Sequence, residues 1–337
     1  MIYICDFFKR HKEAISNQIE LLAINSNSEV IAATRFMGQK SFQKDDRKDK
    51  IYIYPPAIYN LLLPLKIINS CKEPVHYFEE EASSYKRFLF NSTKTPLYIS
   101  MYRRPTSEYI EHIKKYKYLE KIFVELDYHR DILVNGGISK DKVMVAHTPA
   151  KIASCNSTKE FSPSEITLAF ASWNNSEPSA LEDRGMIYLL DLLKKTPGAR
   201  LEIALRDNKI NGFNEIARKL DVIDRVSLNN IANENELLEM FKKSDFVAFC
   251  AQKRVVKDVP NSLLDGLMLS KPVIITDILD FSRVVTKNNI GITIETGSIP
   301  TKLVVSKASY KEMSANAFRY SKLHTPDNYL RILESYK

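Results

Sequence analysis

The chain has 337 residues, which at ~150 residues per domain is enough for about two domains. With 44% hydrophobic and 10% aromatic residues it has the material for packed cores, and 9 glycines beside 14 prolines exclude a collagen-like or Gly-rich chain. The 49 Lys and Arg exceed the 41 Asp and Glu by eight, a net charge of +8. That charge favours anionic partners without distinguishing nucleic acid, lipid headgroups and phosphorylated small molecules.

The cysteines and the apolar runs indicate a cytoplasmic protein. Four cysteines lie too far apart for a metal or redox motif, and we expect Cys5 and Cys250 to be buried thiols; the others are Cys71 and Cys155. The first apolar run is interrupted at once by charged residues, so it does not resemble a targeting signal. The best apolar stretch, residues 58–68, is far shorter than the ~20 residues that span a bilayer.

Short apolar runs alternate with amphipathic stretches in the first half, which is typical of parallel βα units. We predict helices over residues 11–23 and 127–135, the second ended by Gly136 and Gly137, and an exposed polar loop over residues 40–50. The strands predicted here are residues 2–5, 29–33, 51–54, 75–78, 97–100, 121–124 and 142–146.

The same alternation begins again after a Ser-rich linker at residues 152–163. The second half has predicted strands at 166–171, 200–205, 225–228, 246–250, 273–276 and 291–294, and predicted helices at 185–195, 212–220, 233–243 and 260–269. We therefore expect an α/β protein with two doubly wound domains, residues 1–152 and 153–324, that face each other across a cleft. Ligands of such sheets bind beyond the carboxyl ends of the strands.

One βαβ unit carries the most specific signal: a strand at 246–250, a helix at 260–269 and a strand at 273–276. Pro260, Asn261 and Ser262 form a strong helix start, where backbone N–H groups and the positive dipole end favour a phosphate. Asp265 follows about one turn later, where a carboxylate can accept hydrogen bonds from ribose hydroxyls. The leucines and Met268 of this helix predict its buried face.

This unit resembles the donor-site signature of family 4 glycosyltransferases, which have the GT-B fold of two facing Rossmann-like domains. It stands here as Lys257-Asp-Val-Pro-Asn-Ser-Leu-Leu-Asp265, followed by Ser270-Lys-Pro-Val-Ile-Ile-Thr-Asp277. Further similar pieces occur in the family's order from residue 121 onward: Ile166-Thr-Leu-Ala-Phe170, Arg184-Gly185, Glu236-Leu-Leu-Glu239 and Asn328-Tyr-Leu-Arg-Ile-Leu333. The resemblance implies that a last helix, within residues 325–337, crosses back onto the first domain.

The resemblance also implies roles for individual residues. The family's two glutamates, with seven residues between them, correspond to Lys257 and Asp265. Either Asp258 supplies the first acid after a shift of one residue, or Lys257 faces a different donor, such as a carboxylate-bearing sugar, and we take both as catalytic candidates. The donor-binding candidates are Arg184 and Arg206 for the pyrophosphate, Asn261, Ser262 and Leu263 through their amides, and Asp265 for the ribose. The acceptor-side candidates are Lys9, Arg10, Tyr102 and Arg103.

Basic and aromatic residues interleave between residues 85 and 121, with nine Lys and Arg against three Glu. Such a face can rest on anionic lipid or follow a nucleic-acid backbone, and it can also be a solvated surface whose aromatic rings turn inward. We favour the solvated surface, then the membrane, and expect no nucleic-acid partner. Asp277 and Asp280 lie at a strand end, and we assign no metal there and no cofactor.

The resemblance leads us to expect a retaining GT-B glycosyltransferase of bacterial surface polysaccharide synthesis. It would move a sugar from a nucleotide-sugar donor to a glycan or lipid-linked acceptor, in the cytoplasm and peripherally at the inner face of the plasma membrane. One alternative is a nucleotide-sugar epimerase or hydrolase on the same fold, since fold does not fix function. Another is a non-catalytic partner protein that kept the fold, and a basic nucleic-acid-binding protein is the least favoured.

Overall fold

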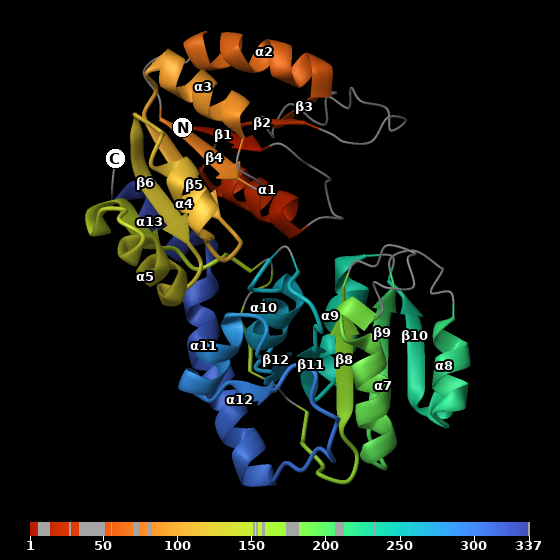
Figure 1. The fold of residues 1–337 in the computed structure, drawn as a ribbon. Helices are drawn as coiled ribbons and strands as arrows, with labels where there is room; N and C mark the ends of the chain where they lie inside the picture. The colour runs from red at the N-terminus through yellow and green to blue at the C-terminus, as the bar shows by residue number, and fades with distance from the viewer. Residues whose placement is uncertain are drawn as a thin grey trace. The chain divides into compact units, whose positions relative to one another are not determined.

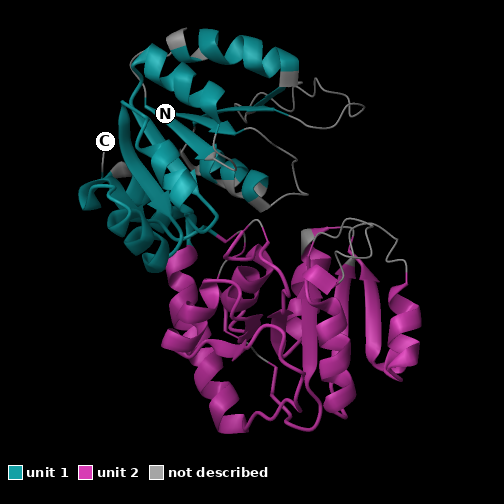
Figure 2. Ribbon diagram, viewed as in Figure 1, with its two compact units in different colours: residues 1–149, 325–337 teal, residues 150–324 magenta. Residues whose placement is uncertain are grey.

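The chain divides into two compact units, residues 1–149 with 325–337 (unit 1) and residues 150–324 (unit 2), which Figure 2 shows in different colours. The computed structural model describes residues 1–5, 14–26, 28–33, 51–54, 56–69, 74–79, 83–150, 152, 154–156, 159–172, 182–205, 212–231, 233–255 and 257–335. The predicted loop at residues 40–50 lies outside these residues.

Unit 1 is built on a parallel sheet in the order β3-β2-β1-β4-β5-β6-β7 (Figure 1). Its strands are β1 (Ile2–Cys5), β2 (Glu29–Ala33), β3 (Ile51–Tyr54), β4 (Val75–Glu79), β5 (Leu97–Met101), β6 (Leu119–Val124) and β7 (Val143–Val145). Its helices are α1 (Ala14–Ser26), α2 (Pro56–Asn69), α3 (Ser84–Thr93), α4 (Ser107–Ile113), α5 (Asp127–Asn135) and α13 (Pro326–Glu334), with a 3₁₀ turn at Lys140–Lys142.

Side chains alternate across this sheet, as the pleat of a strand requires. Ile2 and Ile4 join a buried cluster that includes residues of α2, α3, α4 and α5. Tyr3 and Cys5 join a second cluster that includes residues of α1 and α13. Both faces of the sheet are therefore covered, which explains why its strands are apolar runs in the sequence.

The last helix, α13, is tied to unit 1 by a buried polar chain. The Tyr329 hydroxyl lies 3.0 Å from Ser100 Oγ, and Ser100 Oγ lies 2.8 Å from His76 Nε2. Thr325 caps the helix by accepting from the Asn328 N–H, and Pro326 starts it without losing a needed donor. Burial lowers the pKa of His76 to about 3, so its ring is neutral inside the sheet.

Unit 2 has a second parallel sheet in the order β10-β9-β8-β11-β12-β13. Its strands are β8 (Thr167–Ala171), β9 (Arg200–Leu205), β10 (Val226–Asn230), β11 (Phe246–Phe249), β12 (Val273–Thr276) and β13 (Gly291–Ile294). Its helices are α7 (Met186–Lys195), α8 (Phe213–Lys219), α9 (Glu234–Lys243), α10 (Asn261–Met268), α11 (Phe281–Asn288) and α12 (Lys307–Ser321), with 3₁₀ turns at Ile223–Arg225 and Lys322–His324.

Each predicted strand is present in one of the two sheets, with ends that differ from the prediction by at most two residues. The apolar stretch at 58–68 forms α2, which contains Pro64. Cys5 and Cys250 are buried, as predicted, whereas Cys155 is exposed. No helix in the described part of the chain has both the length and the apolar composition that crossing a membrane requires.

The neutral His76 makes a testable contribution to acid sensitivity. Its folded pKa of about 3 lies below the unfolded value near 6.5, so between these values only the unfolded chain binds the proton, and stability falls as the pH falls. From pH 7 to pH 5 this residue removes about 2 kcal/mol from the free energy of unfolding. The variant His76→Gln lacks this term, and urea unfolding at the two pH values should show a smaller loss than in the wild type. An equal loss in both proteins would contradict the assignment.

Candidate functional site

The topology of unit 2 points to the carboxyl ends of β8 and β11. These strands are neighbours, but the chain continues from β8 to β9 on one side and from β11 to β12 on the other. At such a reversal the two connecting segments leave in opposite directions and open a crevice beyond the strand ends. The segments at this point are residues 172–185 after β8, of which 172 and 182–185 are described, and residues 250–260 after β11.

Gly185 holds these two segments together by direct backbone contact. Its φ is +80°, and a Cβ placed on it would lie 1.8 Å from the carbonyl oxygen of Cys250. The Asp183 carbonyl accepts from the Gln252 N–H at 2.9 Å, and the Asp183 carboxylate pairs with Lys253 at 2.9 Å. Only glycine allows the start of α7 to approach the end of β11 so closely.

Gln252 connects the neighbouring strand ends as well. Its side chain donates to the Cys250 carbonyl at 2.9 Å and accepts from the Gly297 N–H, beyond β13, at 3.2 Å. Thr276, at the end of β12, donates its hydroxyl to the Ala251 carbonyl at 2.6 Å. Gln252 was not among the predicted site residues, because a glutamine in a polar loop gives no signal of its own and the order of the strands brings its partners near.

Arg184 comes from the same turn and is partly buried. Its guanidinium donates to the Ser172 hydroxyl. Burial lowers the pKa of Arg184 from its ordinary value, and the neighbouring Asp183 carboxylate acts in the opposite direction. Arginine stays charged in proteins, so this is a cation that has lost part of its hydration at the strand ends. Such a group gains from an anion that binds beside it.

Helix α10 begins directly beyond the loop after β11. Its cap is Pro260, and its leucines and Met268 are buried as predicted, with Gly266 packed directly against Val247. The amides of Asn261, Ser262 and Leu263 are the predicted phosphate ligands of this helix. The Leu263 N–H donates to the Pro260 carbonyl at 3.1 Å, so the first-turn amides that lie before the helical bonding pattern are those of Asn261 and Ser262. Asp265 lies on the half-buried side of the helix.

Lys257 and Asp258 are both buried, and each has a defined partner. The Lys257 ammonium donates to Asn261 Oδ1 at 2.6 Å and so contacts the first residue of α10. The Asp258 carboxylate pairs with Arg254 at 3.1 Å, and Arg254 also reaches the buried Asp280 at 3.5 Å. Buried carboxylates need such a cation to offset their lost hydration.

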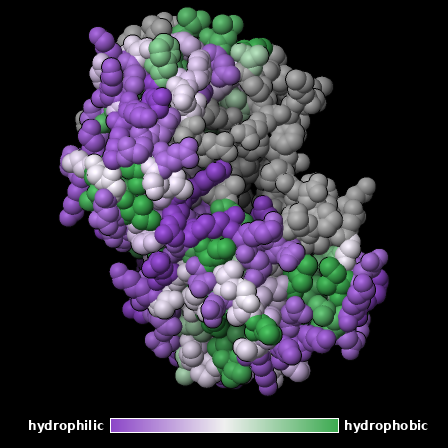
Figure 3. All heavy atoms as spheres, in the orientation of Figure 1, coloured by the Kyte–Doolittle hydropathy of each residue, from purple (hydrophilic) through white to green (hydrophobic). Residues whose placement is uncertain are grey.

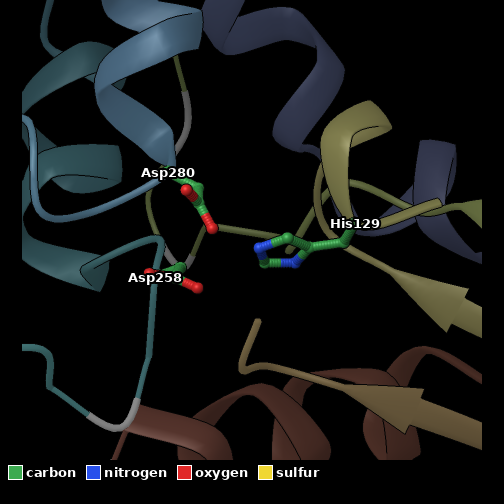
Figure 4. Close-up of side chains that lie close together, drawn as sticks. All are labelled: His129, Asp258 and Asp280. Carbon is green, nitrogen blue, oxygen red and sulfur yellow. The ribbon is translucent and has the colours of Figure 1, made fainter. Parts of the chain in front are cut away.

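Figure 4 shows the Asp258 and Asp280 carboxylates close together, one from the loop before α10 and the other from the start of α11. Arg254 pairs with both acids and so links the loop between β11 and α10 to the start of α11. Arg254 was not among our predicted site residues, because its partner Asp280 lies 26 positions further along the chain. The third residue labelled in Figure 4, His129, belongs to α5 of unit 1, where it is fully buried.

The acceptor-side candidates belong to unit 1. Tyr102 follows β5 at its carboxyl end, is buried and stacks on Phe78 with ring centroids 6.2 Å apart. Arg103 is half-buried at the same strand end. Lys9, Arg10 and Arg206 lie outside the residues that the structure describes.

The Gly185 contact predicts an unequal response to two glycine substitutions. Gly185→Ala adds a Cβ against a backbone carbonyl, so the free energy of unfolding should fall by about 3 kcal/mol or more. Gly297→Ala is the matched control: its φ is +76°, but no atom lies within 4 Å of the added Cβ, and the cost should be about 1–2 kcal/mol. Urea unfolding of both variants measures the difference, and equal losses would contradict the close contact.

Solved structures match the fold of this chain. No protein-family model matches the chain, and no curated protein is significantly similar to it in sequence. The structure of HepE from Anabaena in complex with UDP and glucose has a TM-score of 0.74 at 10% identity, with 99% of each chain covered. The lipopolysaccharide outer core galactosyltransferase WaaB has a TM-score of 0.67 at 13% identity, with 100% and 99% covered.

A glycosyltransferase from Rickettsia africae is similar over 100% of this chain and 97% of its own, with a TM-score of 0.70 at 13% identity. These likenesses extend over both units, and both sheets have the all-parallel order of doubly wound folds. The chain therefore has the GT-B fold of these glycosyltransferases, as its sequence motifs predicted.

Proposed function

We propose that the protein is a glycosyltransferase that moves a sugar from a nucleotide-sugar donor to a glycan or lipid-linked acceptor. The observation that carries this proposal is the position of Arg184, a partly desolvated cation. It precedes Gly185, which contacts the segment that leads from β11 to the N-terminus of α10, at the point where the strand order of unit 2 reverses. Both features favour an anion at the place where doubly wound sheets bind ligands. Similarity to HepE, whose structures contain UDP and UDP-glucose, supports a nucleotide sugar as that anion.

In this proposal the nucleotide binds to unit 2. The Arg184 guanidinium and the amides of Asn261 and Ser262 contact the pyrophosphate, and Arg206 adds a second cation. The Asp265 carboxylate accepts hydrogen bonds from the ribose hydroxyls. As the bond to the sugar breaks, negative charge develops on the departing pyrophosphate, and fixed donors of this kind stabilise it without reorganising. The positive charge comes from side chains and the helix dipole, so we assign no metal and no cofactor to the reaction.

Lys257 and Asp258 are the residues that we propose to act near the donor sugar. Lys257 contacts the first residue of α10, and Asp258 is held by Arg254, so both are positioned by contacts within unit 2. A buried lysine ammonium beside a pyrophosphate site strengthens the stabilisation of the leaving group. We further propose that the configuration at the anomeric carbon is retained.

For the acceptor we propose a glycan or a lipid-linked glycan of bacterial surface polysaccharide synthesis. WaaB is a lipopolysaccharide outer core galactosyltransferase, and WaaG is a glycosyltransferase involved in lipopolysaccharide biosynthesis, which supports an acceptor of this class. Arg103 is the described acceptor-side candidate that keeps contact with solvent. An acceptor with a lipid anchor would bring a cytoplasmic enzyme to the inner face of the plasma membrane.

Nucleotide binding is the first test. We expect one of UDP, GDP, ADP, CDP and dTDP to raise the melting temperature by several degrees, because a ligand at about 100 times its dissociation constant contributes about 2.7 kcal/mol. In Asp265→Ala the affinity for that nucleotide should fall about tenfold or more, since hydrogen bonds to a charged group are lost. Isothermal titration measures the affinity.

Asp224→Ala is the matched control, because Asp224 is an exposed carboxylate in the 3₁₀ turn before the edge strand β10, at the amino end of the parallel strands, whereas the site lies at their carboxyl ends. An unchanged affinity in Asp265→Ala would remove Asp265 from the site. No thermal shift with any of the five nucleotides would instead favour a non-catalytic protein that kept the fold.

Lys257 can be tested separately from nucleotide binding. In Lys257→Gln the slow release of nucleotide from the nucleotide sugar should fall about 100-fold, because a charge that stabilises the leaving group is gone. The thermal shift caused by the bare nucleotide diphosphate should be reduced far less. Lys253→Gln is the control. Lys253 lies in the same loop as Lys257, but it is largely exposed and pairs with Asp183. Equal turnover by Lys257→Gln and the wild type would argue against a catalytic role.

A further inference from the structure

We propose that unit 1 docks on an anionic lipid surface through the outer face of α2 and α3. This inference extends the proposed function, because a lipid-linked acceptor is reached at a membrane. Its evidence is nevertheless the surface of unit 1 alone. Unit 1 and the nucleotide site of unit 2 can be tested independently, so the two proposals can fail separately.

Helix α2 is apolar on two opposite sides. Tyr59, Leu63 and Ile67 recur at every fourth position and are buried in the core beneath the helix. On the other side Leu61 is 71% exposed and Leu65 is 55% exposed, with Ile58 one turn before them. A surface helix of a soluble domain normally turns charged or polar residues to the outside. The outer side of α2 is therefore an exposed apolar surface that does not contribute to the buried core of unit 1.

Helix α3 continues this surface. Tyr85 is 44% exposed and Phe88, three residues later on the same side of the helix, is 71% exposed. The Tyr85 hydroxyl donates to the Asn60 carbonyl of α2 at 2.8 Å, so the two helices are joined side by side. We call Ile58, Leu61, Leu65, Tyr85 and Phe88 the α2–α3 patch. Figure 3 shows apolar side chains gathered over these helices.

Helices α2 and α3 contain basic residues but no acidic ones. The basic residues are Lys66, Lys86 and Arg87. The Lys86 ammonium is buried under the patch, 4.1 Å from the ring centroid of Tyr59 and 5.7 Å from that of Tyr85. Asn91 of α3 also holds the basic turn at 115–117, through the Lys115 carbonyl at 3.0 Å and the Lys117 N–H at 2.7 Å.

This combination fits an anionic bilayer better than a nucleic acid. A phosphate backbone is held by cations that reach outward, whereas the outward positions here are Leu and Phe and the cation Lys86 is turned inward. A membrane interface accepts both parts: apolar side chains enter the acyl boundary, and positive charge near the surface is attracted to anionic headgroups. Helix α2 has 14 residues, about 21 Å at 1.5 Å per residue, so it lies along the surface and does not span it.

The test is a vesicle sedimentation assay with the full chain, which measures the fraction of protein that sediments with lipid vesicles. We expect binding to phosphatidylcholine vesicles that contain about 30% phosphatidylglycerol, weaker binding to phosphatidylcholine alone, and a loss of affinity as salt is added. In the triple variant Leu61→Gln, Leu65→Gln, Phe88→Gln the apparent affinity should fall more than tenfold. These side chains are exposed, so the variant should fold, and an unchanged circular-dichroism spectrum with an unchanged urea-unfolding midpoint would confirm that.

The matched control is the double variant Ile299→Gln, Val304→Gln, which replaces equally exposed apolar side chains of unit 2 and should bind vesicles as the wild type does. Wild-type affinity in the triple variant would overturn the proposal, as would equal binding to neutral and anionic vesicles. A dimer in solution that the triple variant converts to monomer, without any change in vesicle binding, would assign the α2–α3 patch to a second copy of the chain and would also overturn it.

Discussion

The backbone contact between Gly185 and the Cys250 carbonyl is the constraint on which the candidate site depends. It brings the start of α7 against the end of β11, and so fixes where the chain goes after two strands that are neighbours in the sheet. Arg184 precedes this glycine, so the position of its guanidinium is set by a contact that no side chain could make. The hydrogen bonds of Gln252 then extend the same framework to the loop after β13. Contacts of this kind position groups before a ligand arrives, which lowers the entropic cost of binding.

Ion pairs around the start of α10 also position the residues of the candidate site. The two buried acids Asp258 and Asp280 both pair with Arg254, and Asp280 also pairs with Arg283 at 3.9 Å, so the loop before α10 belongs to an ion-pair network. Lys257, adjacent to that network, contacts Asn261 at the positive end of the α10 dipole. A cation at a helix N-terminus is unfavourable by itself, and a bound diphosphate would relieve this cost. This electrostatic cost supports the proposal that the site binds a diphosphate.

The pattern of apolar runs was enough to predict the strands, because a parallel sheet covered on both faces leaves an almost continuous hydrophobic run for each strand. The start of α10 was equally readable, since Pro260 and Asn261 are local signals. The bond from the Leu263 amide to the Pro260 carbonyl was not foreseen, because a tight first turn has no sequence signal of its own. Gln252 and Arg254 were missed because their partners, Gly297 and Asp280, are distant in sequence and are brought near only by the order of the strands.

The anchoring of α13 has a consequence for how the chain is made. Tyr329 and Leu333 belong to the same buried cluster as Tyr3 and Cys5, and Tyr329 closes the polar chain to Ser100 and His76. A ribosome therefore releases the whole of unit 2 before it releases the helix that completes unit 1. Until then the apolar surface that α13 covers is open to water or to a chaperone, while unit 2 already has every strand of its sheet. Unit 2 should thus be able to fold during synthesis, before unit 1 is complete. Unit 1 completes its core only when α13 has been synthesised.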